Sequence, residues 1–385
     1  MMGLNKMNKN EPPIRVLHVV TAMNMAGTEV MLMNLHRCIN RDIIQFDYAV
    51  CSEEKCAFDD EILALGGKIY HYPKYKIINH FKYVKWWNNF FREHKNYRII
   101  HGHVGSTAAI YLGLAKKYGY YAIAHSHNTY GNFNIRMFVY WLFSYRTRYI
   151  ADYFFGCSED ALVSRFGRKI LSNSCHQILP NAIDVSKFQF DENKRMKIRT
   201  ELGISKNEFV IGTIGRLTIQ KNPEKILSII KNLYKRKINF KLLWIGAGEL
   251  KTMIINEINR SNLNANIILI ESRDDIPDLL SAMDIFIFPS KWEGLGVAAI
   301  EAQVAGLPII CSTVVPKEVR LADDCYFLPL NDDNSWENLI IKLSNRKKIN
   351  RSTLNRMKAS GYNVLITAQK MTDFYLNKYK KISAI

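Results

Sequence analysis

Several features are missing from this 385-residue sequence, and each absence narrows the class of protein. No apolar run reaches the roughly 18 residues of a membrane-spanning helix, so none is predicted. Residues 1–13 lack the apolar core of a signal peptide and form a polar lead-in. The seven cysteines include no C-x-x-C pair, which favours reduced thiols in a cytoplasmic setting. No Asp-x-Asp motif or metal-ligand spacing is visible, so we predict no metal ion or cofactor.

Acidic residues are scarce relative to basic ones. The chain has 53 Lys and Arg against 35 Asp and Glu, which gives a formal net charge of +18. Such an excess favours anionic partners: nucleotides, nucleic acid or an acidic membrane surface. A genome rich in Lys and Asn codons could produce the same excess, so the charge alone does not choose among these partners.

The chain alternates strand-like and helical stretches over a length that suits two domains of roughly 150–200 residues each. Strand-like runs in the first half lie at 16–20, 46–51, 68–71, 99–103, 122–125, 153–157 and 177–179. Those in the second half lie at 209–215, 241–246, 267–270, 285–288, 309–311 and 326–328. This alternation predicts parallel sheets covered by helices. The predicted fold class is therefore α/β, with two Rossmann-like domains facing across a cleft.

The boundaries of these domains are predicted from composition. An N-terminal domain is expected at 14–185, and a C-terminal domain at 207–362. The stretch 186–206 is polar and highly charged, and we interpret it as the linker. Ligands of such sheets bind beyond the carboxyl ends of the strands, so strand ends from both domains are expected to line the cleft.

Residues 284–312, DIFIFPSKWEGLGVAAIEAQVAGLPIICS, form the most informative segment. A strand-like run leads to Glu293, turns through Gly294 and Gly296, and enters a helical stretch that carries Glu301. A strand that ends in a glycine turn before a helix presents free backbone N–H groups to an anion. The two carboxylates therefore flank a predicted phosphate site. The alternative is an ordinary crossover in which the acids only stabilise the helix end.

This segment resembles the donor site of retaining family-4 glycosyltransferases of the GT-B fold. The residues that match the family pattern are Pro289-Ser290, Glu293-Gly294, Glu301-Ala302 and Gly306-Leu307-Pro308-Ile309. The resemblance implies that Glu301 holds the ribose hydroxyls of a nucleotide. It also implies that Glu293, with the N–H groups near Gly296 and Val297, contacts the donor sugar and diphosphate. The resemblance further implies that the first domain binds the acceptor and the second the nucleotide-sugar, and that the last helical stretch, 363–385, crosses back onto the first domain.

A second motif lies where a predicted strand ends. It contains Arg216 and, five residues later, Lys221. A planar guanidinium fork and a point-like ammonium together suit a diphosphate. The alternative is a pair of solvated loop cations. The family pattern G-R-L-x-x-x-K-N is matched in full, which implies that both cations bind the donor diphosphate and stabilise the leaving group without a metal ion.

The first half contributes further candidates by resemblance. Gly27 corresponds to the second of two family glycines and is expected to let the backbone approach phosphate or acceptor. A family histidine at the end of a strand contacts the donor sugar, and His127 matches it better than the runner-up, His125. With His101 and His103 these form a cluster of four histidines. We predict no metal there, on the view that H-x-H side chains alternate along a strand and that no carboxylate is near.

Two stretches, 74–98 and 136–148, combine aromatic with basic residues. Helices of this kind lie well at anionic bilayer interfaces, although ordinary sheet-covering helices also need apolar faces. Together with the net charge, these stretches predict peripheral attachment to the cytoplasmic face of the cell membrane.

The combined prediction is a retaining hexosyltransferase that acts in capsular or exopolysaccharide biosynthesis. It would move a hexose from a nucleotide-sugar, with a UDP-sugar favoured, to a lipid-linked or other saccharide acceptor. The predicted catalytic residues are Glu293, His127, Arg216 and Lys221. The predicted donor-binding residues are Gly27, Arg216, Lys221, Glu293, Gly294, Leu295, Gly296, Val297 and Glu301. Two alternatives stay open: a nucleotide-sugar 2-epimerase of the same fold, and a nucleic-acid-binding protein, although no recognised nucleic-acid module is present.

Overall fold

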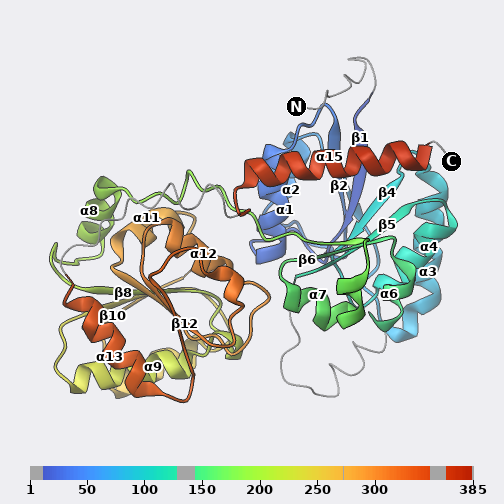
Figure 1. Cartoon of the computed structure of the whole chain (residues 1–385). Coiled ribbons are helices and arrows are strands. Elements are labelled where there is room, and N and C mark those ends of the chain that lie inside the picture. Colours follow the sequence, from blue (N-terminus) through green and yellow to red (C-terminus); the bar gives the residue numbers. More distant parts are fainter. Residues whose placement is uncertain (1–11, 128–143, 272, 347–360, 384–385) are drawn as a thin grey trace. The chain divides into compact units, whose positions relative to one another are not determined.

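The computed structural model describes residues 12–127, 144–271, 273–346 and 361–383 (Figure 1). The chain divides into two compact units. The first comprises Met1–Ile183 and Gly361–Ile385, and the second comprises Asp184–Ser360. Among the described helices, none combines the length and the apolar character needed to cross a membrane.

The first unit is built on a parallel sheet of seven strands in the order β3-β2-β1-β4-β5-β6-β7. The strands are β1 (Ile14–Val19), β2 (Ile44–Val50), β3 (Ile69–His71), β4 (Ile99–Gly102), β5 (Tyr121–Ser126), β6 (Tyr153–Gly156) and β7 (His176–Ile178). The helices are α1 (Gly27–Cys38), α2 (Asp59–Ala64), α3 (His80–Glu93), α4 (Ala108–Lys117), α6 (Thr147–Ile150), α7 (Glu159–Phe166) and α15 (Val364–Ser383). Short 3-10 turns, η1 (Ile77–Asn79) and η2 (Arg168–Ser172), complete it.

Both faces of this sheet are covered, as expected for a parallel sheet with strands that are apolar on both sides. On one face Val16 packs in a core with residues of α1, α2 and α15. On the other face Leu17 packs in a core with residues of α3, α4 and α7. Side chains alternate between the two faces along each strand, so β1 contributes to both cores.

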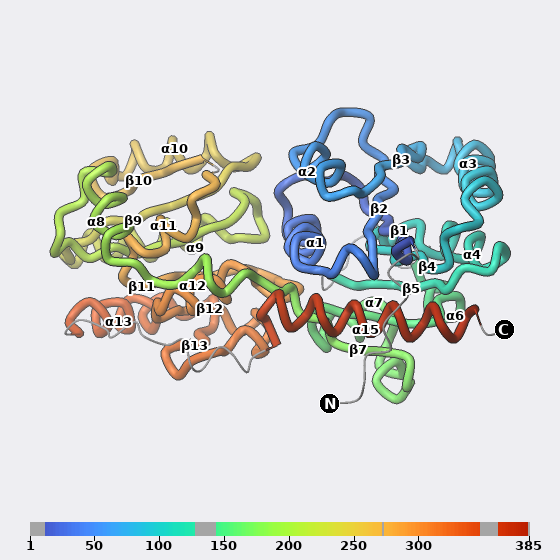
Figure 2. Tube along the Cα trace, turned by 90° about the horizontal axis from the view of Figure 1, so that it is seen from above, coloured from blue at the N-terminus to red at the C-terminus, as the bar shows by residue number. Residues whose placement is uncertain are grey.

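The last helix, α15, packs against α1 in the first unit (Figures 1 and 2). Its start is fixed to the end of the first segment, because the Ile183 N–H donates to the Tyr362 carbonyl at 2.8 Å and the Val364 N–H donates to the Ile183 carbonyl at 3.1 Å. Buried Ala368, Met371 and Tyr375 then cover the sheet. The predicted return of the C-terminal helix to the first domain is confirmed.

The second unit contains a parallel sheet of six strands in the order β10-β9-β8-β11-β12-β13. The strands are β8 (Val210–Ile214), β9 (Lys241–Ile245), β10 (Ile267–Ile270), β11 (Ile285–Phe288), β12 (Ile309–Ser312) and β13 (Cys325–Leu328). The helices are α8 (Glu192–Glu201), α9 (Pro223–Lys235), α10 (Lys251–Arg260), α11 (Ile276–Ala282), α12 (Val297–Val304) and α13 (Asp333–Ser344), with 3-10 turns η3 (Ile219–Lys221) and η4 (Lys317–Val319). The predicted α/β class with two parallel sheets is confirmed.

The stretch predicted as a linker, 186–206, contains α8. Asp191 caps its start by accepting from the Asn193 and Lys194 N–H groups, at 2.8 and 3.2 Å. The helix packs against α11 within the second unit. Residues 192–201 of the predicted linker therefore form a helix that packs within the second unit.

Candidate donor-binding site

The two motifs of the second half follow neighbouring strands. β8 pairs with β9 on one side and with β11 on the other, and the strand order diverges in both directions from the β8–β11 pair. Parallel α/β sheets bind ligands beyond the carboxyl ends of the strands at such a divergence, because the following loops lead away to opposite sides. The segments after β8 and β11 therefore occupy the position where a ligand is expected.

These two segments are tied together by hydrogen bonds. The Lys291 N–H donates to the Gln220 carbonyl at 2.8 Å, and Gln220 Nε2 donates to the Trp292 carbonyl at 3.0 Å. Asn222 Nδ2 donates to the Pro289 carbonyl at 3.1 Å. Asn222 has left-handed backbone angles (φ 55°, ψ 56°), which asparagine tolerates better than most residues. Sequence reasoning assigned no role to Gln220 or Asn222, although the Asn-Pro pair before α9 is a turn signal.

Lys221 and Glu293 form an ion pair across these segments. Lys221 Nζ lies 2.6 Å from Glu293 Oε1 and 4.4 Å from the centroid of the Phe288 ring. Glu293 is only 7% exposed. Because a partly buried pair is screened less by solvent than a surface pair, each charge holds the other in place. The structure thus joins two residues from separate sequence motifs, both of which the resemblance assigned to the donor diphosphate.

Glu301 lies in α12 and is close enough to Lys221 for the two charges to interact. Burial raises the pKa of the Glu301 carboxyl to about 7, and the positive charge of Lys221 partly opposes this shift. A glutamate held this way is poised between its neutral and charged forms near physiological pH. Its oxygens could accept hydrogen bonds from the hydroxyls of a ligand.

The N-terminus of α12 completes this group. Gly296 precedes the helix with left-handed backbone angles (φ 93°, ψ 58°), and no side chain caps the first turn. A Cβ at this position would lie 3.0 Å from the Phe288 ring. Buried Leu295 anchors the turn, and the N–H groups from Val297 onward begin the helix. Such a terminus attracts anions through its free N–H groups and its dipole.

Arg216 differs from the other candidates of the second unit. Its side chain is exposed, and no hydrogen bond or ion pair joins it to another residue in the described part of the chain. It follows β8 directly, in the same segment as Lys221. The structure therefore brings Lys221, Glu293 and Glu301 together beside the start of α12, and leaves the Arg216 side chain exposed.

Two glycines after β9, Gly246 and Gly248, support this segment by close packing. A Cβ at Gly246 would lie 2.0 Å from the Gly215 carbonyl oxygen, and one at Gly248 would lie 2.5 Å from the Leu217 carbonyl oxygen. The Leu217 N–H donates to the Ala247 carbonyl at 2.9 Å. Only glycine fits such an approach of two backbones.

Gly27 and His127 lie in the first unit. Gly27 is the first residue of α1, which has no side-chain cap, and a Cβ added to it would meet nothing within 4 Å. His127 follows β5 and keeps some exposed surface, whereas His125 is fully buried. Burial and the positive charge of Arg165 lower the pKa of His127 to about 3, so its imidazole is neutral. The roles of Gly27 and His127 remain predictions.

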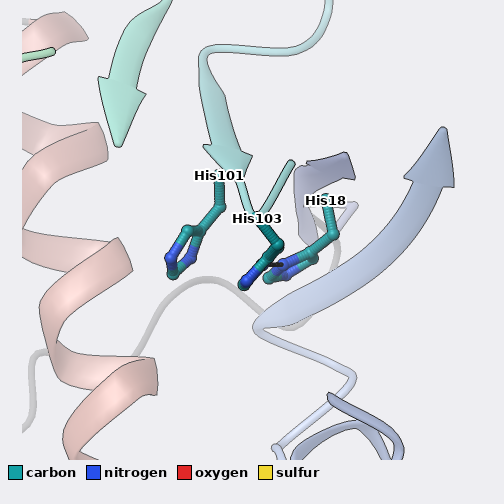
Figure 3. Close-up of side chains that lie close together, drawn as sticks. All are labelled: His18, His101 and His103. Carbon is teal, nitrogen blue, oxygen red and sulfur yellow. Dashed lines mark hydrogen bonds between the residues drawn. The ribbon is translucent and has the colours of Figure 1, made fainter. Parts of the chain in front are cut away.

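The reason given for excluding a metal from the histidine cluster is wrong. Residues two apart on a strand point to the same face. The rings of His101 and His103 stack with centroids 4.5 Å apart, and those of His125 and His127 with centroids 4.0 Å apart. The sequence analysis also missed His18 on β1, which pairs in register with His101 (Figure 3). Register between strands cannot be read from spacing along one chain.

Three comparisons place this geometry among known proteins. The family model "Glycosyl transferases group 1" matches residues 194–364. EpsF of Bacillus subtilis, which carries a glycosyltransferase name, is 31% identical over 317 residues, or 80% of this chain and 82% of that protein. An Escherichia coli enzyme named UDP-Gal:alpha-D-GlcNAc-diphosphoundecaprenol alpha-1,3-galactosyltransferase is 32% identical over 207 residues, or 52% of this chain and 54% of that enzyme. Anabaena HepE in complex with UDP has a TM-score of 0.76 at 14% identity, covering 94% of this chain and 100% of that one.

The two parallel sheets define an α/β protein of the GT-B fold, which the likeness to HepE supports. The chain belongs to the glycosyl transferases group 1 family and is a glycosyltransferase.

Proposed function

We propose that this glycosyltransferase moves a hexose, with retention, from a UDP-sugar to a lipid-linked saccharide during cell-surface polysaccharide synthesis at the cytoplasmic face of the membrane. Two names support the choice of substrates. The name of the Escherichia coli enzyme includes UDP-Gal and a diphosphoundecaprenol-linked acceptor, and the HepE structure is described as a complex with UDP. The single observation that carries the proposal is the Lys221–Glu293 ion pair beside the uncapped start of α12.

The proposed chemistry follows from these charges. The donor diphosphate would receive hydrogen bonds from the N–H groups at the start of α12, and positive charge from Lys221 and Arg216. When the bond from sugar to phosphate breaks, negative charge grows on the diphosphate, and fixed donors stabilise it without reorganising. Glu293 would hold Lys221 in place and accept from a sugar hydroxyl, and Glu301 would accept from the ribose. In this proposal the step at the diphosphate requires no metal ion.

His127 has a proposed role at the donor sugar. A neutral imidazole can bind a hydroxyl without adding charge near the reacting carbon; because Nε2 of His127 already contacts His103 Nδ1 at 2.7 Å, this contact would use Nδ1. The low pKa of His127 keeps it in this form over the physiological range. We assign it a contact with the donor sugar, with His125 less suited because that residue is fully buried.

The first test substitutes the members of the ion pair. Glu293→Gln should keep UDP binding but lower turnover by roughly 100- to 1,000-fold, the usual cost of losing one transition-state contact. Lys221→Met should weaken UDP binding as well, because it removes charge at the diphosphate. Calorimetric titration with UDP, GDP and ADP, and transfer from the corresponding sugars, would measure both effects.

The matched control is Lys231→Met, which breaks a different Lys–Glu pair, with Glu257, in the same unit. It should leave UDP binding and turnover unchanged. Wild-type turnover in Glu293→Gln would contradict the proposal. Tighter binding of GDP or ADP than of UDP would contradict the choice of UDP as the donor nucleotide.

Membrane attachment is proposed at a narrower surface than the sequence suggested. Most large aromatics of 74–98 are buried in the first unit, and 136–148 lies largely outside the described residues. The exposed part is the Ile77–Phe81 patch, formed by Ile77, Ile78 and Phe81, which are 70%, 92% and 88% exposed. The exposed lysines around it in sequence are Lys74, Lys76, Lys82 and Lys85. Apolar side chains among lysines suit an anionic bilayer surface.

The prediction for this patch is that the protein sediments with vesicles that contain anionic phospholipid, and that Ile78→Asp with Phe81→Asp abolishes this. Leu63→Asp is the control, because Leu63 is also apolar and exposed (57%) but lies in α2. Equal sedimentation with neutral and anionic vesicles, or no effect of the double substitution, would contradict this surface.

A further inference from the structure

Five histidines of the first unit, which are His18, His101, His103, His125 and His127, lie on one face of the sheet. Three contacts pair some of their ring nitrogens. His18 Nδ1 lies 3.0 Å from His103 Nε2, His103 Nδ1 lies 2.7 Å from His127 Nε2, and His101 Nδ1 lies 2.7 Å from Tyr375 Oη. The remaining nitrogens are buried and have no hydrogen-bond partner among the residues that the structure describes; they are His18 Nε2, His101 Nε2, both nitrogens of His125 and His127 Nδ1.

This many unpaired nitrogens is an unusual cost for a protein interior. A neutral imidazole carries one donor and one acceptor, and each buried polar atom without a partner destabilises the fold. Burial lowers the pKa of all five rings, so protonation does not supply charge to them. Their lone pairs are therefore available to a cation that prefers nitrogen.

Two sets of three histidines have the spacing of a metal site. In His18, His101 and His103, one nitrogen from each ring lies within 4.8 Å of the others, and the same holds for His103, His125 and His127. Neither set includes a carboxylate, which argues against calcium or magnesium. Imidazole alone suits zinc and its neighbours in the first transition series, and three histidines are a known zinc ligand set.

Arg165 distinguishes the two sets. It is buried and donates through Nη1 to the His125 carbonyl, and its charge contributes to the low pKa of His125 and His127. Because Arg165 contacts the His125 backbone, its fixed positive charge would repel a divalent cation bound to His103, His125 and His127. The set containing His18 and His101 is therefore favoured.

Tyr375 supports the favoured set from α15. When the proton of His101 is on Nδ1 and is donated to Tyr375 Oη, the Nε2 lone pair is free to coordinate. Both nitrogens of His103 already have a partner, Nδ1 at His127 and Nε2 at His18, so His103 would coordinate through Nε2 in place of its contact with His18. Metal-binding histidines regularly use their second nitrogen in this way, which fixes the tautomer and the ring.

We propose that His18, His101 and His103 bind one divalent transition-metal ion of the zinc class inside the first unit, with Tyr375 as a positioning residue (Figure 3). The ion would link β1 to the end of β4 and, through Tyr375, to α15. Its role is structural: it would hold the C-terminal helix on a sheet formed by the beginning of the chain. It takes no part in the step at the diphosphate.

The experiment measures metal content and thermal stability of the full-length protein. Protein produced in zinc-supplemented medium and dialysed should retain one zinc ion per chain by elemental analysis, and refolding with cobalt should give the visible absorption of tetrahedral Co²⁺. His18→Asn and His101→Asn should lose the ion and its thermal stabilisation. Tyr375→Phe, which keeps every ligand, should weaken zinc affinity roughly 10- to 100-fold.

Two controls make the outcome specific. His36→Asn changes another buried histidine of the same unit, which contacts Gln45 and Tyr48 instead, and should retain the ion. His125→Asn should retain it too. Absence of bound zinc and cobalt from the folded wild-type protein would overturn the proposal, as would loss of metal from His125→Asn but not from His18→Asn. Unchanged zinc affinity in Tyr375→Phe would overturn the role of Tyr375.

Discussion

At the scale of single residues, Glu301 is a carboxylate in a place where folding alone does not favour one. Its pKa is raised to about 7 because burial penalises the charged form, and Lys221 only partly offsets that penalty. A group retained against such a cost usually serves binding or catalysis. The proposed contact with ribose hydroxyls gives Glu301 such a purpose.

The raised pKa of Glu301 predicts a pH-dependent stability. Below pH 4.5 both the folded and the unfolded chain carry a protonated Glu301, so stability is full. Between pH 4.5 and about 7 only the unfolded chain loses this proton, so stability falls as pH rises, by up to about 3 kcal/mol. Glu301→Gln should therefore be more stable than the wild type at pH 8 and similar at pH 4.5, while UDP binding is lost.

Thermal unfolding at both pH values would check this prediction for Glu301. Glu257→Gln is a useful comparison, because the salt bridges of Glu257 lower its pKa instead, so that substitution should not stabilise the protein at pH 8. A Glu301→Gln protein that is less stable than the wild type at pH 8 would contradict the argument.

At this scale the sequence predicted the residues of the proposed donor site, but not the contacts between them. Offsets along the chain identified Lys221 and Glu293, because the family pattern fixes both positions. The ion pair between them depends on the pairing of β8 with β11, which spacing along one chain does not encode. His18 was missed for the same reason, since it meets the other histidines only through the register of β1 with β4.

At the scale of elements, α8 shows how a charged sequence can form an anchored helix. Arg199 is 1% exposed; it donates to Asp284 at 2.7 Å and to the carbonyls of Ser205, Lys206 and Glu208 at 2.9–3.0 Å. Arg195 donates to the other oxygen of Asp284 at 2.7 Å. The helix is fixed by guanidinium groups rather than by an apolar stripe. The polar and charged composition of 186–206, which predicted a linker, therefore did not reveal this helix.

Arg199→Ala should destabilise the second unit by about 3–5 kcal/mol, the usual cost of breaking a buried pair from one side. Arg195→Ala should cost less, because Arg199 remains on Asp284 and Arg195 is more exposed. Denaturant unfolding of both variants, followed by the fluorescence of Trp244 and Trp336 in that unit, would measure the difference. Equal losses in the two variants would contradict this account of the α8 anchor.

At the scale of the whole molecule, the chain leaves and re-enters the first unit at one place. Ile183 and Asn363 form a parallel bridge, so the ends of the inserted segment 184–360 are neighbours. The first unit needs its last helix, because Met371 and Tyr375 belong to the core that covers the sheet. The fold of this unit is thus completed by residues far apart in sequence.

This arrangement predicts that residues 1–183 joined to 361–385 by a short Gly-Ser link will fold, whereas residues 1–183 alone will not. Closing the gap requires little added chain, since its two ends already share hydrogen bonds. Circular dichroism and cooperative thermal unfolding would compare the two proteins. A folded 1–183 fragment of equal stability would show that α15 contributes little.

The overall fold was the easiest feature to predict, because it depends on patterns that span the whole chain. Strand-like runs of three to seven residues separated by helical stretches mark every strand of both sheets to within about two residues. The return of α15 to the first unit was predicted only from the family resemblance, because periodicity alone does not show which sheet a helix covers.

The bridge between Ile183 and Asn363 also bears on how such enzymes diversify. A gene rearrangement that replaced the intervening stretch with that of a relative would leave the other core and its helix untouched. A single recombination event could thereby exchange the second unit, with its proposed donor site, without disturbing the fold of the first.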